Sequence, residues 1–253
     1  MLHFNDKVVF VTGASGGIGA QMARDFGAAG AKLVVHNYGL AEATQRLLAE
    51  LSAAGVDHLL VEGDVTQSAQ IAKMVAAIQD RYGRLDVLVN NAGASGQKMD
   101  FGQLPQEVWD DILRVNLTSV FLMTQACLPL LQTAGGASIV NISSTAARNG
   151  GVVTGSAYAT AKGAVSTLTR ALAKDFCARG IRVNAVAPGL IDTPFYGDIN
   201  VRERYAERVK SIPLRRVGEP ADVSRPVMFL ASSLASYITG EVLEISGGLS
   251  MMA

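Results

Sequence analysis

The glycine-rich stretch TGASGGIG occupies residues 12–19 of this chain. It follows the apolar run KVVFV, residues 7–11, and precedes the helix-like stretch AQMARDFGAAG, residues 20–30. Glycine tolerates backbone dihedrals and close approaches that other residues do not, so the cluster can serve simply to turn the chain. The same place also suits a pyrophosphate, because backbone N–H groups and the helix dipole point into the turn. The spacing Gly-x-x-x-Gly-x-Gly is one residue longer than the usual dinucleotide fingerprint, so the octet alone leaves both uses open.

Further short apolar runs rich in β-branched residues follow, and stretches with helical spacing separate them. Strands that are apolar throughout are buried on both faces, as is typical of parallel strands covered by helices on each side. The sequence therefore predicts an α/β fold, a doubly wound parallel sheet of about seven strands within a single domain, residues 1–253. The predicted strands are residues 7–13, 32–37, 58–65, 85–93, 137–144, 182–189 and 241–248.

Composition excludes several classes of function. The chain has 22 basic and 22 acidic side chains and no block of like charge, which disfavours nucleic-acid binding. No uninterrupted apolar run reaches the roughly 18 to 20 residues of a membrane span, and the N-terminus lacks a signal-peptide pattern. We therefore expect a cytoplasmic protein that does not enter the membrane. Cys127 and Cys177 lie in helix-like stretches without partners at metal spacing, so we expect reduced packing residues and no metal site.

Three more motifs carry chemistry. NNAG, residues 90–93, ends the fourth predicted strand, and Ser144 ends the fifth. SAYATAK, residues 156–162, places Tyr158 and Lys162 four residues apart on one helix face. A phenol with a pKa of about 10 is a poor general base at neutral pH, so a nearby ammonium has to favour the phenolate. A serine hydroxyl can then hydrogen-bond the substrate oxygen and stabilise developing charge.

Together these motifs closely resemble the short-chain dehydrogenase/reductase family. The resemblance rests on TGASGGIG, the aspartate of GDV (Asp64), NNAG, Asn116 in RVNLTSVF, NISS, YATAK and APGLIDTP, and it extends from about residue 5 to the final SGG. It implies a Rossmann-type fold and the NAD(P)-dependent interconversion of a small-molecule secondary alcohol and a ketone by hydride transfer. The nicotinamide ring performs the hydride chemistry.

The resemblance also implies roles for individual residues. Tyr158 is the general acid/base, and Lys162 lowers its pKa and anchors the nicotinamide ribose. Ser144 holds the substrate oxygen, and Asn116 bends its helix and completes a proton relay. The family commonly has thirteen positions from the serine to the tyrosine, whereas this chain has fourteen, so we expect a one-residue bulge within residues 148–155.

By the same resemblance, a larger set of residues is expected to contact the pyrophosphate, adenine, ribose and nicotinamide amide of the cofactor. Ile18 and Val65 of this set can serve equally as core residues. The set is Gly13, Ser15, Gly17, Ile18, Gly19, Asn37, Asp64, Val65, Asn91, Ala92, Gly93, Tyr158, Lys162, Pro188, Gly189, Ile191 and Thr193.

The choice between NAD and NADP depends on the end of the second predicted strand. NAD-preferring relatives place an aspartate there, which binds the adenosine ribose and repels a 2′-phosphate. This chain has Asn37 instead, so the repulsion is missing. The cation of NADP-preferring relatives is missing as well, because Gly16 and Tyr38 occupy its usual places. We expect a weak preference for NADP(H) over NAD(H).

The long polar insertion at about residues 190–215 follows the sixth predicted strand and is the predicted substrate lid. Other predicted pocket walls are residues 94–101 and 150–155. The lid arginines Arg202, Arg204 and Arg208 could recognise an anionic substrate, although charges on a polar helix are usually solvated.

Three alternatives remain beside a small-molecule dehydrogenase. A β-ketoacyl-acyl-carrier-protein reductase would need a basic surface for its acidic carrier. Such enzymes are often basic in the loop before the fifth strand, but here residues 131–138 carry no charge, and only Arg179 provides a positive charge of the kind expected. A non-catalytic dinucleotide sensor would not need Ser144, Tyr158 and Lys162. An epimerase or dehydratase relative usually has a longer chain with a separate substrate domain.

The predicted helix beginning at residue 156 carries Ala, Thr and Ser over much of its surface, beyond what one sheet face needs. The family resemblance implies a homotetramer with such helices paired across a two-fold axis.

Overall fold

Seven parallel strands form one sheet in the computed structural model, which describes residues 2–151, 155–197 and 200–252. The strands are β1 (Val8–Val11), β2 (Lys32–Asn37), β3 (His58–Glu62), β4 (Val87–Asn90), β5 (Ser138–Ile142), β6 (Arg182–Pro188) and β7 (Val242–Ile245). Their order in the sheet is β3-β2-β1-β4-β5-β6-β7, and every neighbouring pair is parallel. The doubly wound α/β fold predicted from the sequence is confirmed.

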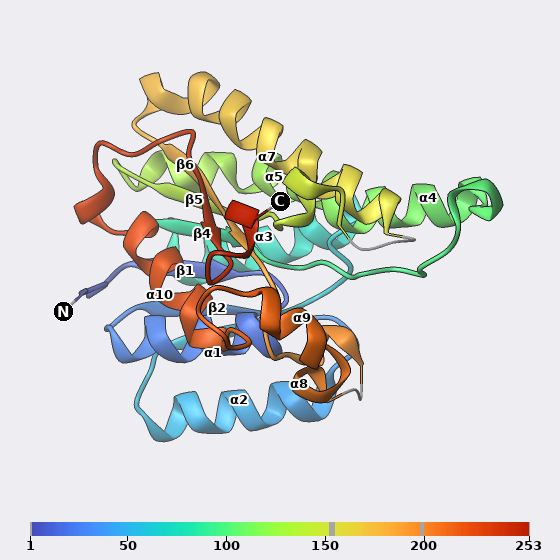
Figure 1. The fold of residues 1–253 in the computed structure, drawn as a ribbon. Helices are drawn as coiled ribbons and strands as arrows, with labels where there is room; N and C mark the ends of the chain where they lie inside the picture. The colour runs from blue at the N-terminus through green and yellow to red at the C-terminus, as the bar shows by residue number, and fades with distance from the viewer. Residues whose placement is uncertain (1, 152–154, 198–199, 253) are drawn as a thin grey trace.

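Helices cover both faces of this sheet (Figure 1). The α-helices of the described residues are α1 (Gly17–Ala28), α2 (Ala41–Ala53), α3 (Ser68–Tyr82), α4 (Gln106–Leu113), α5 (Ser119–Thr133), α6 (Ala146–Asn149), α7 (Ser156–Phe176), α8 (Val201–Arg204), α9 (Ala206–Ser211) and α10 (Pro220–Ala231). One core cluster joins α1, α2 and α10 to one face of the sheet, and a second joins α3, α5 and α7 to the other. Because both faces are covered, the central strands β1, β4 and β5 are buried along their whole length.

Helices α4 and α5 form a continuous helical run, residues 106–133, joined by the π-helical segment Arg114–Thr118. By length and composition alone this run could cross a membrane. However, its side chains Met123, Cys127 and Leu131 are buried in the core cluster that α3 and α7 share. We therefore interpret the run as a core helix of the α/β fold.

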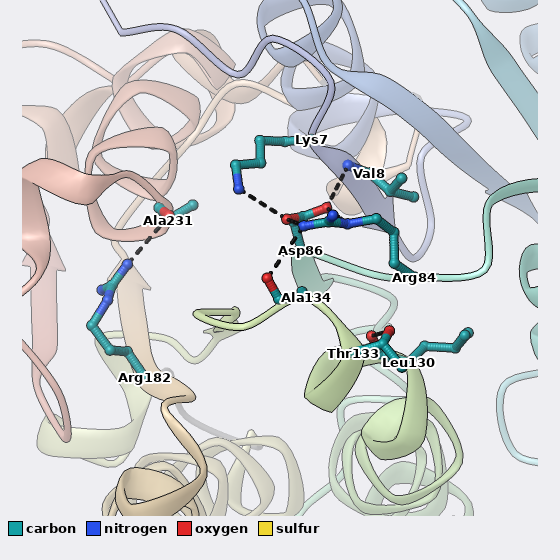
Figure 2. Close-up of polar contacts among 9 residues, drawn as sticks. All are labelled: Lys7, Val8, Arg84, Asp86, Leu130, Thr133, Ala134, Arg182 and Ala231. Atoms are coloured by element: carbon teal, nitrogen blue, oxygen red, sulfur yellow. Dashed lines mark hydrogen bonds and ion pairs between the residues drawn. The ribbon is translucent and has the colours of Figure 1, made fainter.

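The amino-terminal edge of the sheet is held by two polar clusters (Figure 2). Asp86, directly before β4, accepts hydrogen bonds from Lys7 Nζ and the Val8 N–H, each at 3.0 Å, and two from the Arg84 guanidinium. Arg182, the first residue of β6, donates to the carbonyl oxygens of residues 230, 231 and 232, where α10 ends. Both clusters therefore support the fold at the edge opposite the carboxyl ends of the strands.

The direction of winding reverses between β1 and β4. After β1 the chain adds β2 and β3 on one side, then returns to add β4 to β7 on the other. The loops that leave β1 and β4 consequently diverge, and a crevice forms at the carboxyl ends of these strands. This crevice is where an open parallel sheet binds its ligands.

The chain between Ser144 and Tyr158, predicted to hold one extra residue, contains a short helix and a glycine turn. Helix α6 follows Ser144, and Gly150 and Gly151 then turn the chain with φ of 78° and 80°, which favours glycine. Residues 152–154, which belong to the predicted bulge and pocket wall, lie outside the described residues, as do lid residues 198–199.

Candidate active site

A cleft of about 750 Å³ lies at the carboxyl ends of strands β1 to β6. It is lined by residues from the loops that follow these strands and from the lid after β6. Most residues predicted for the site line it together. They are Gly13, Ser15, Gly17, Ile18, Gly19, Asp64, Val65, Asn91, Ala92, Gly93, Ser144, Tyr158, Lys162, Pro188, Gly189, Ile191 and Thr193. Two predicted residues, Asn37 and Asn116, lie behind the lining.

The glycine turn between β1 and α1 is shaped by close approaches. Gly13 and Gly17 have φ of 62° and 52°, in the left-handed region. A Cβ on Gly19 would lie 2.1 Å from Gly13 O, so only glycine lets α1 pack onto its own turn. No side chain caps the N-terminus of α1. The open N–H groups and the helix dipole therefore face the cleft, and the turn fits a pyrophosphate.

The turn is fastened to the end of β4 by Thr12 and Asn91. The Thr12 hydroxyl accepts the N–H groups of Asn91 and Ala92, each at 2.9 Å. The Asn91 amide donates back to Thr12 O at 2.8 Å and to Gly13 O at 3.1 Å. These hydrogen bonds fix the loop after β1 against the loop after β4. Thr12 is not among the residues predicted for the site, although it is the first residue of TGASGGIG.

The end of β2 places its last two side chains in opposite directions, as alternation along a strand requires. His36 lines the cleft and is 1% exposed. Its Nδ1 accepts the Gly13 N–H at 2.9 Å, and its Nε2 lies 2.7 Å from Gly63 O. Burial lowers the pKa of His36, against the raising effects of the Gly63 carbonyl and the Asp64 charge. The imidazole therefore joins the loops after β1 and β3.

Asn37 is enclosed by polar partners away from the lining. Its Oδ1 accepts the Ser15 hydroxyl at 3.0 Å and the Leu40 N–H at 3.1 Å. Its Nδ2 donates to Glu62 Oε1 at 3.0 Å. The contact with Glu62 was not predicted from the sequence. The carboxylate of Glu62 therefore adds a negative charge beside the amide.

Tyr158 and Lys162 project from α7 into the cleft, one helical turn apart. Lys162 Nζ lies 5.8 Å from the centre of the Tyr158 ring and donates to Ile142 O at 2.8 Å. Burial lowers the pKa of Lys162 to about 8, which leaves the ammonium mostly charged at neutral pH. A buried positive charge beside a phenol favours the phenolate, so this pair can exchange a proton with a ligand.

The two serines that end β5 have different surroundings. The Ser143 hydroxyl is buried, where it donates to Lys162 O at 2.9 Å and lies 2.7 Å from Ser166 Oγ. Ser144 is only partly buried and accepts the Ala146 N–H at 3.1 Å. Ser143 therefore supports α7, and Ser144 is the hydroxyl available to a ligand.

Asn116 lies in the π-helical segment between α4 and α5. Its Nδ2 donates to Ile112 O at 3.0 Å and Ala94 O at 2.9 Å, and its Oδ1 accepts the Ala94 N–H at 3.2 Å. A Cβ on Gly93 would lie 2.8 Å from Asn116 Oδ1 and 3.4 Å from Lys162 Nζ. Asn116 thus ties the helix to the loop after β4, directly beside Lys162.

The lid contributes apolar and basic side chains. Phe195 packs against Tyr158 with 5.9 Å between ring centres. Arg202 turns away to Asp192 and Glu219, at 2.9 and 3.5 Å. Arg208 instead lines the cleft. Of the three lid arginines, only Arg208 is among the residues that line the cleft.

Neither cysteine contributes to the site. Burial raises the pKa of Cys127 to about 12, so its thiol is unreactive. Cys177 is exposed after α7 and donates to Lys174 O, so the prediction of a packing residue is wrong for this cysteine. Among the described residues, no group of three or more His, Cys, Asp or Glu side chains could hold a metal ion.

Comparison with known proteins agrees with this architecture. A family model described as enoyl-(acyl carrier protein) reductase matches residues 13–250. The 3-oxoacyl-[acyl-carrier-protein] reductase FabG of Staphylococcus aureus is 34% identical over 97% of this chain and 98% of its own. The cis-4-hydroxycyclohexanecarboxylate dehydrogenase of Sinomonas cyclohexanicum is 37% identical over 97% of each chain. The crystal structure of levodione reductase superimposes with a TM-score of 0.91 at 33% identity, covering 99% of this chain and 100% of that one.

Proposed function

Because the chain belongs to the short-chain dehydrogenase/reductase family and is an NAD(P)-dependent oxidoreductase acting on CH–OH groups, we propose that it interconverts a small-molecule secondary alcohol and its ketone. The observation that carries this proposal is the buried Lys162 ammonium beside the Tyr158 ring, in the same cleft as the glycine turn. A merely binding protein would have no need to bury a charge next to a phenol.

In this proposal Tyr158 handles the proton. During oxidation its phenolate takes the proton of the substrate hydroxyl, and during reduction its phenol returns that proton to the carbonyl oxygen. Lys162 keeps the phenolate accessible near neutral pH through its positive charge. Ser144 donates a hydrogen bond to the substrate oxygen and stabilises the charge that develops there. Asn116 positions the loop after β4 beside Lys162 and completes the proton relay.

The cofactor residues of the proposal are those that line the cleft. The turn at Gly13 to Gly19 would hold the pyrophosphate, Asp64 and Val65 the adenine, and Asn91 with Lys162 the ribose next to nicotinamide. Residues 188–193 would hold the nicotinamide amide. When bound, the nicotinamide ring accepts or supplies the hydride.

For the cofactor we propose a weak preference for NADP(H) over NAD(H). The absence of a carboxylate at position 37 supports it, because an aspartate there would repel a 2′-phosphate. Glu62 limits the preference, because its carboxylate lies 3.0 Å from the Asn37 amide. Asn37 itself acts through its neighbours, since it lies behind the cleft lining.

For the substrate we propose a compact ketone or secondary alcohol that the lid, residues 190–215, covers. Phe195 supplies an apolar wall against Tyr158, and Arg208 supplies a positive charge. A substrate bearing a carboxylate would suit this pair. The relative named for cis-4-hydroxycyclohexanecarboxylate makes a cyclic hydroxy acid a reasonable first compound to test.

The acyl-carrier-protein substrate remains the second candidate, favoured by the similarity to FabG. Against it stands the uncharged loop at residues 131–138, where a basic surface for an acidic carrier would be expected. A non-catalytic dinucleotide sensor is disfavoured by the assembled Ser144, Tyr158 and Lys162.

We also propose that the protein is a cytoplasmic homotetramer that binds neither nucleic acid nor membrane. The formal net charge of zero supports the part concerning nucleic acid.

The test follows the absorbance of reduced nicotinamide while a panel of secondary alcohols and ketones is offered with NAD(H) and NADP(H). The panel pairs each hydroxy acid with its neutral amide and includes an acyl-carrier-protein thioester. We expect turnover of small molecules, with acids preferred over amides. Tyr158→Phe should lower kcat by at least about a hundredfold while cofactor binding survives. Near-normal turnover by Tyr158→Phe, or activity confined to the carrier thioester, would contradict the proposal.

A further inference from the structure

His36 makes contacts that the dehydrogenase chemistry does not require of it. Its ring lies at the end of β2, between the glycine turn after β1 and the loop after β3. It reaches the first glycine of the turn on one side and Gly63 on the other. At 1% exposure it has no access to bulk water, yet it lines the cleft.

These two contacts define the protonation state of the ring. The Gly13 N–H can only donate, so His36 Nδ1 has to be the unprotonated nitrogen. Gly63 O can only accept, so Nε2 carries the proton. The two bonds together require the neutral Nε2–H tautomer. An imidazolium would present a second N–H to the Gly13 N–H, and that bond would be lost.

We infer that neutral His36 is a positioning residue that holds the Gly13 backbone in its cofactor-binding conformation, so that protonation of His36 weakens dinucleotide binding. The inference rests on dinucleotide binding at this cleft. Gly13 opens the turn that would hold the pyrophosphate, has a φ of 62° and donates its N–H to His36 on β2. Losing the bond frees the start of the turn, which has to be ordered again when the diphosphate binds.

The charged groups around His36 set the direction of the effect. Asp64, in the loop that also supplies Gly63, favours the imidazolium, and Arg114 lies beyond Asp64. Glu62 on β3 is occupied by Asn37. Burial outweighs these charges and holds the pKa of His36 below its ordinary value of about 6.5. Affinity for the cofactor is therefore full at neutral pH and falls as the pH drops through the pKa of His36.

The chain offers a matched pair of variants for the test. The amide oxygen of His36→Asn can stand near the position of Nδ1 and accept the Gly13 N–H. The amide of His36→Gln can stand near Nε2 and donate to Gly63 O instead. His58 provides the control, because it lies at the start of β3 with its Nδ1 2.8 Å from Val56 O, remote from the cleft. His58→Gln should leave cofactor binding unchanged.

The experiment measures the Kd of NADH and of NADPH by fluorescence titration from about pH 8 to about pH 5.5 at constant ionic strength. The 2′-phosphate of NADPH titrates in this range, so the comparison with each variant removes the contribution of the ligand. We expect the wild-type Kd to rise toward low pH and the His36 variants to lose the His36 part of this dependence. At pH 8, His36→Gln should bind about tenfold more weakly than wild type, and His36→Asn should lie between them.

Thermal unfolding of each variant without cofactor separates binding from folding. A variant that binds weakly at an unchanged Tm supports the positioning role, and so does the order wild type, Asn, Gln in affinity. A wild-type Kd that is flat with pH overturns the inference, as does equal loss in both variants in proportion to their loss of Tm. If neither dinucleotide binds the wild type, the proposed function itself fails, which is a different result from binding that ignores His36.

Discussion

Lys162 carries its ammonium in a position that is only 4% exposed, where burial lowers its pKa to about 8. A lysine with a lowered pKa destabilises the folded state while it is charged, and this cost disappears as the pH rises above the pKa of the unfolded chain. The shift from 10.5 corresponds to about 3 kcal/mol. If Lys162 has the proposed catalytic role, the site retains a group that lowers the stability of the fold, as often occurs in active sites.

The variant Lys162→Met tests both the proposed role of Lys162 in activity and cofactor binding and the cost of its burial to stability. We expect it to lose activity and to bind NAD(P)H more weakly, because in the proposed function one ammonium supports the phenolate and anchors a ribose. Removing the buried charge should raise the Tm at pH 7, and the loss of the hydrogen bond to Ile142 O should lower it by less. The Tm should therefore equal or exceed that of wild type. Lys174→Met, an exposed change on the same helix, is the control. A variant that lost only activity, or only binding, would disprove the double role.

The pair Asn37 and Glu62 makes a second prediction at the residue scale. Asn37→Asp should lower kcat/KM for NADP(H) by more than about tenfold and spare NAD(H), because a carboxylate repels the 2′-phosphate. It would also place two carboxylates together, since Glu62 accepts from the Asn37 amide. The variant should therefore be measured beside Asn37→Asp/Glu62→Gln, in which the glutamine amide donates to the new aspartate.

The double variant should recover the Tm that the single one loses and keep its preference for NAD(H). A cofactor ratio unchanged from wild type in both would show that the end of β2 does not select the cofactor. The same conclusion would follow if the wild type already rejected NADP(H).

At the scale of elements, the start of β4 is held by Asp86, whose carboxylate accepts hydrogen bonds from Lys7, Arg84 and the Val8 N–H. Burial alone would raise the pKa of this carboxyl, but these hydrogen bonds outweigh burial and hold the pKa below its ordinary value. A depressed carboxyl pKa stabilises the fold above the unfolded pKa, and the contribution disappears as the pH falls through the folded pKa.

We therefore expect Asp86→Asn to reduce the free energy of unfolding at pH 7 by about 3 kcal/mol, because two cations lose a buried partner. Urea unfolding should show this difference shrinking as the pH is lowered below about 4. Asp86 directly precedes β4 and is not among the residues that line the cleft at the carboxyl ends of the strands, so KM should not change. A difference that stays constant down to acid pH would show that packing, and not charge, is the contribution of Asp86.

The end of α10 depends on Arg182. Its guanidinium donates to Leu230 O at 2.7 Å, Ala231 O at 3.2 Å and Ser232 O at 3.0 Å, so one side chain satisfies carbonyls that have no partner within the helix. The positive charge also lies at the negative end of the helix dipole. Burial lowers the pKa of Arg182, although a guanidinium stays charged at any working pH.

We expect Arg182→Met to lower stability by about 2–4 kcal/mol, and Arg182→Lys to recover only part of this, because an ammonium lacks the planar fork. Arg225→Met, an exposed change on α10, should be close to neutral. Thermal and urea unfolding provide the measurement. Full rescue by lysine would mean that charge alone, without the fork, holds the end of the helix.

At the scale of the whole molecule, two helix layers enclose the sheet but leave an outer surface of small and apolar residues on one layer. Along α7 the outward positions include Thr160, Ala164 and Thr167, and on α5 Phe121 is 47% exposed. Such a surface lets a partner helix approach closely, and isologous pairing is the common route to closed assemblies.

We expect multi-angle light scattering to give the mass of a homotetramer at micromolar concentration. Phe121→Glu should shift the mass toward smaller species, because a charge would be buried in the paired helices. A monomer for the wild type would contradict the assembly, and a tetramer unaffected by Phe121→Glu would move the interface away from α5.

The alternation of strands and helices along the chain and the parallel doubly wound sheet were predictable from the sequence, because buried parallel strands are apolar throughout. Most residues of the cleft lining were predicted through the family resemblance, and glycine is required where Gly13 and Gly19 approach each other. The Tyr158–Lys162 pair was equally readable, since four residues on a helix always share a face.

Which side chains at the strand ends reach the cleft could not be predicted from the sequence. Alternation fixes that His36 and Asn37 face opposite sides, but not which side is the cleft, because that depends on the pairing of β2 with β1 and β3. The fold directs Asn37 to Ser15 and Glu62 and gives His36 the contact with Gly13, and neither set of partners was predicted from the sequence. The role of Asn37 in cofactor choice stays a prediction. Partners such as Glu62 and the α10 carbonyls of Arg182 are distant in sequence, so only the assembled sheet brings them together.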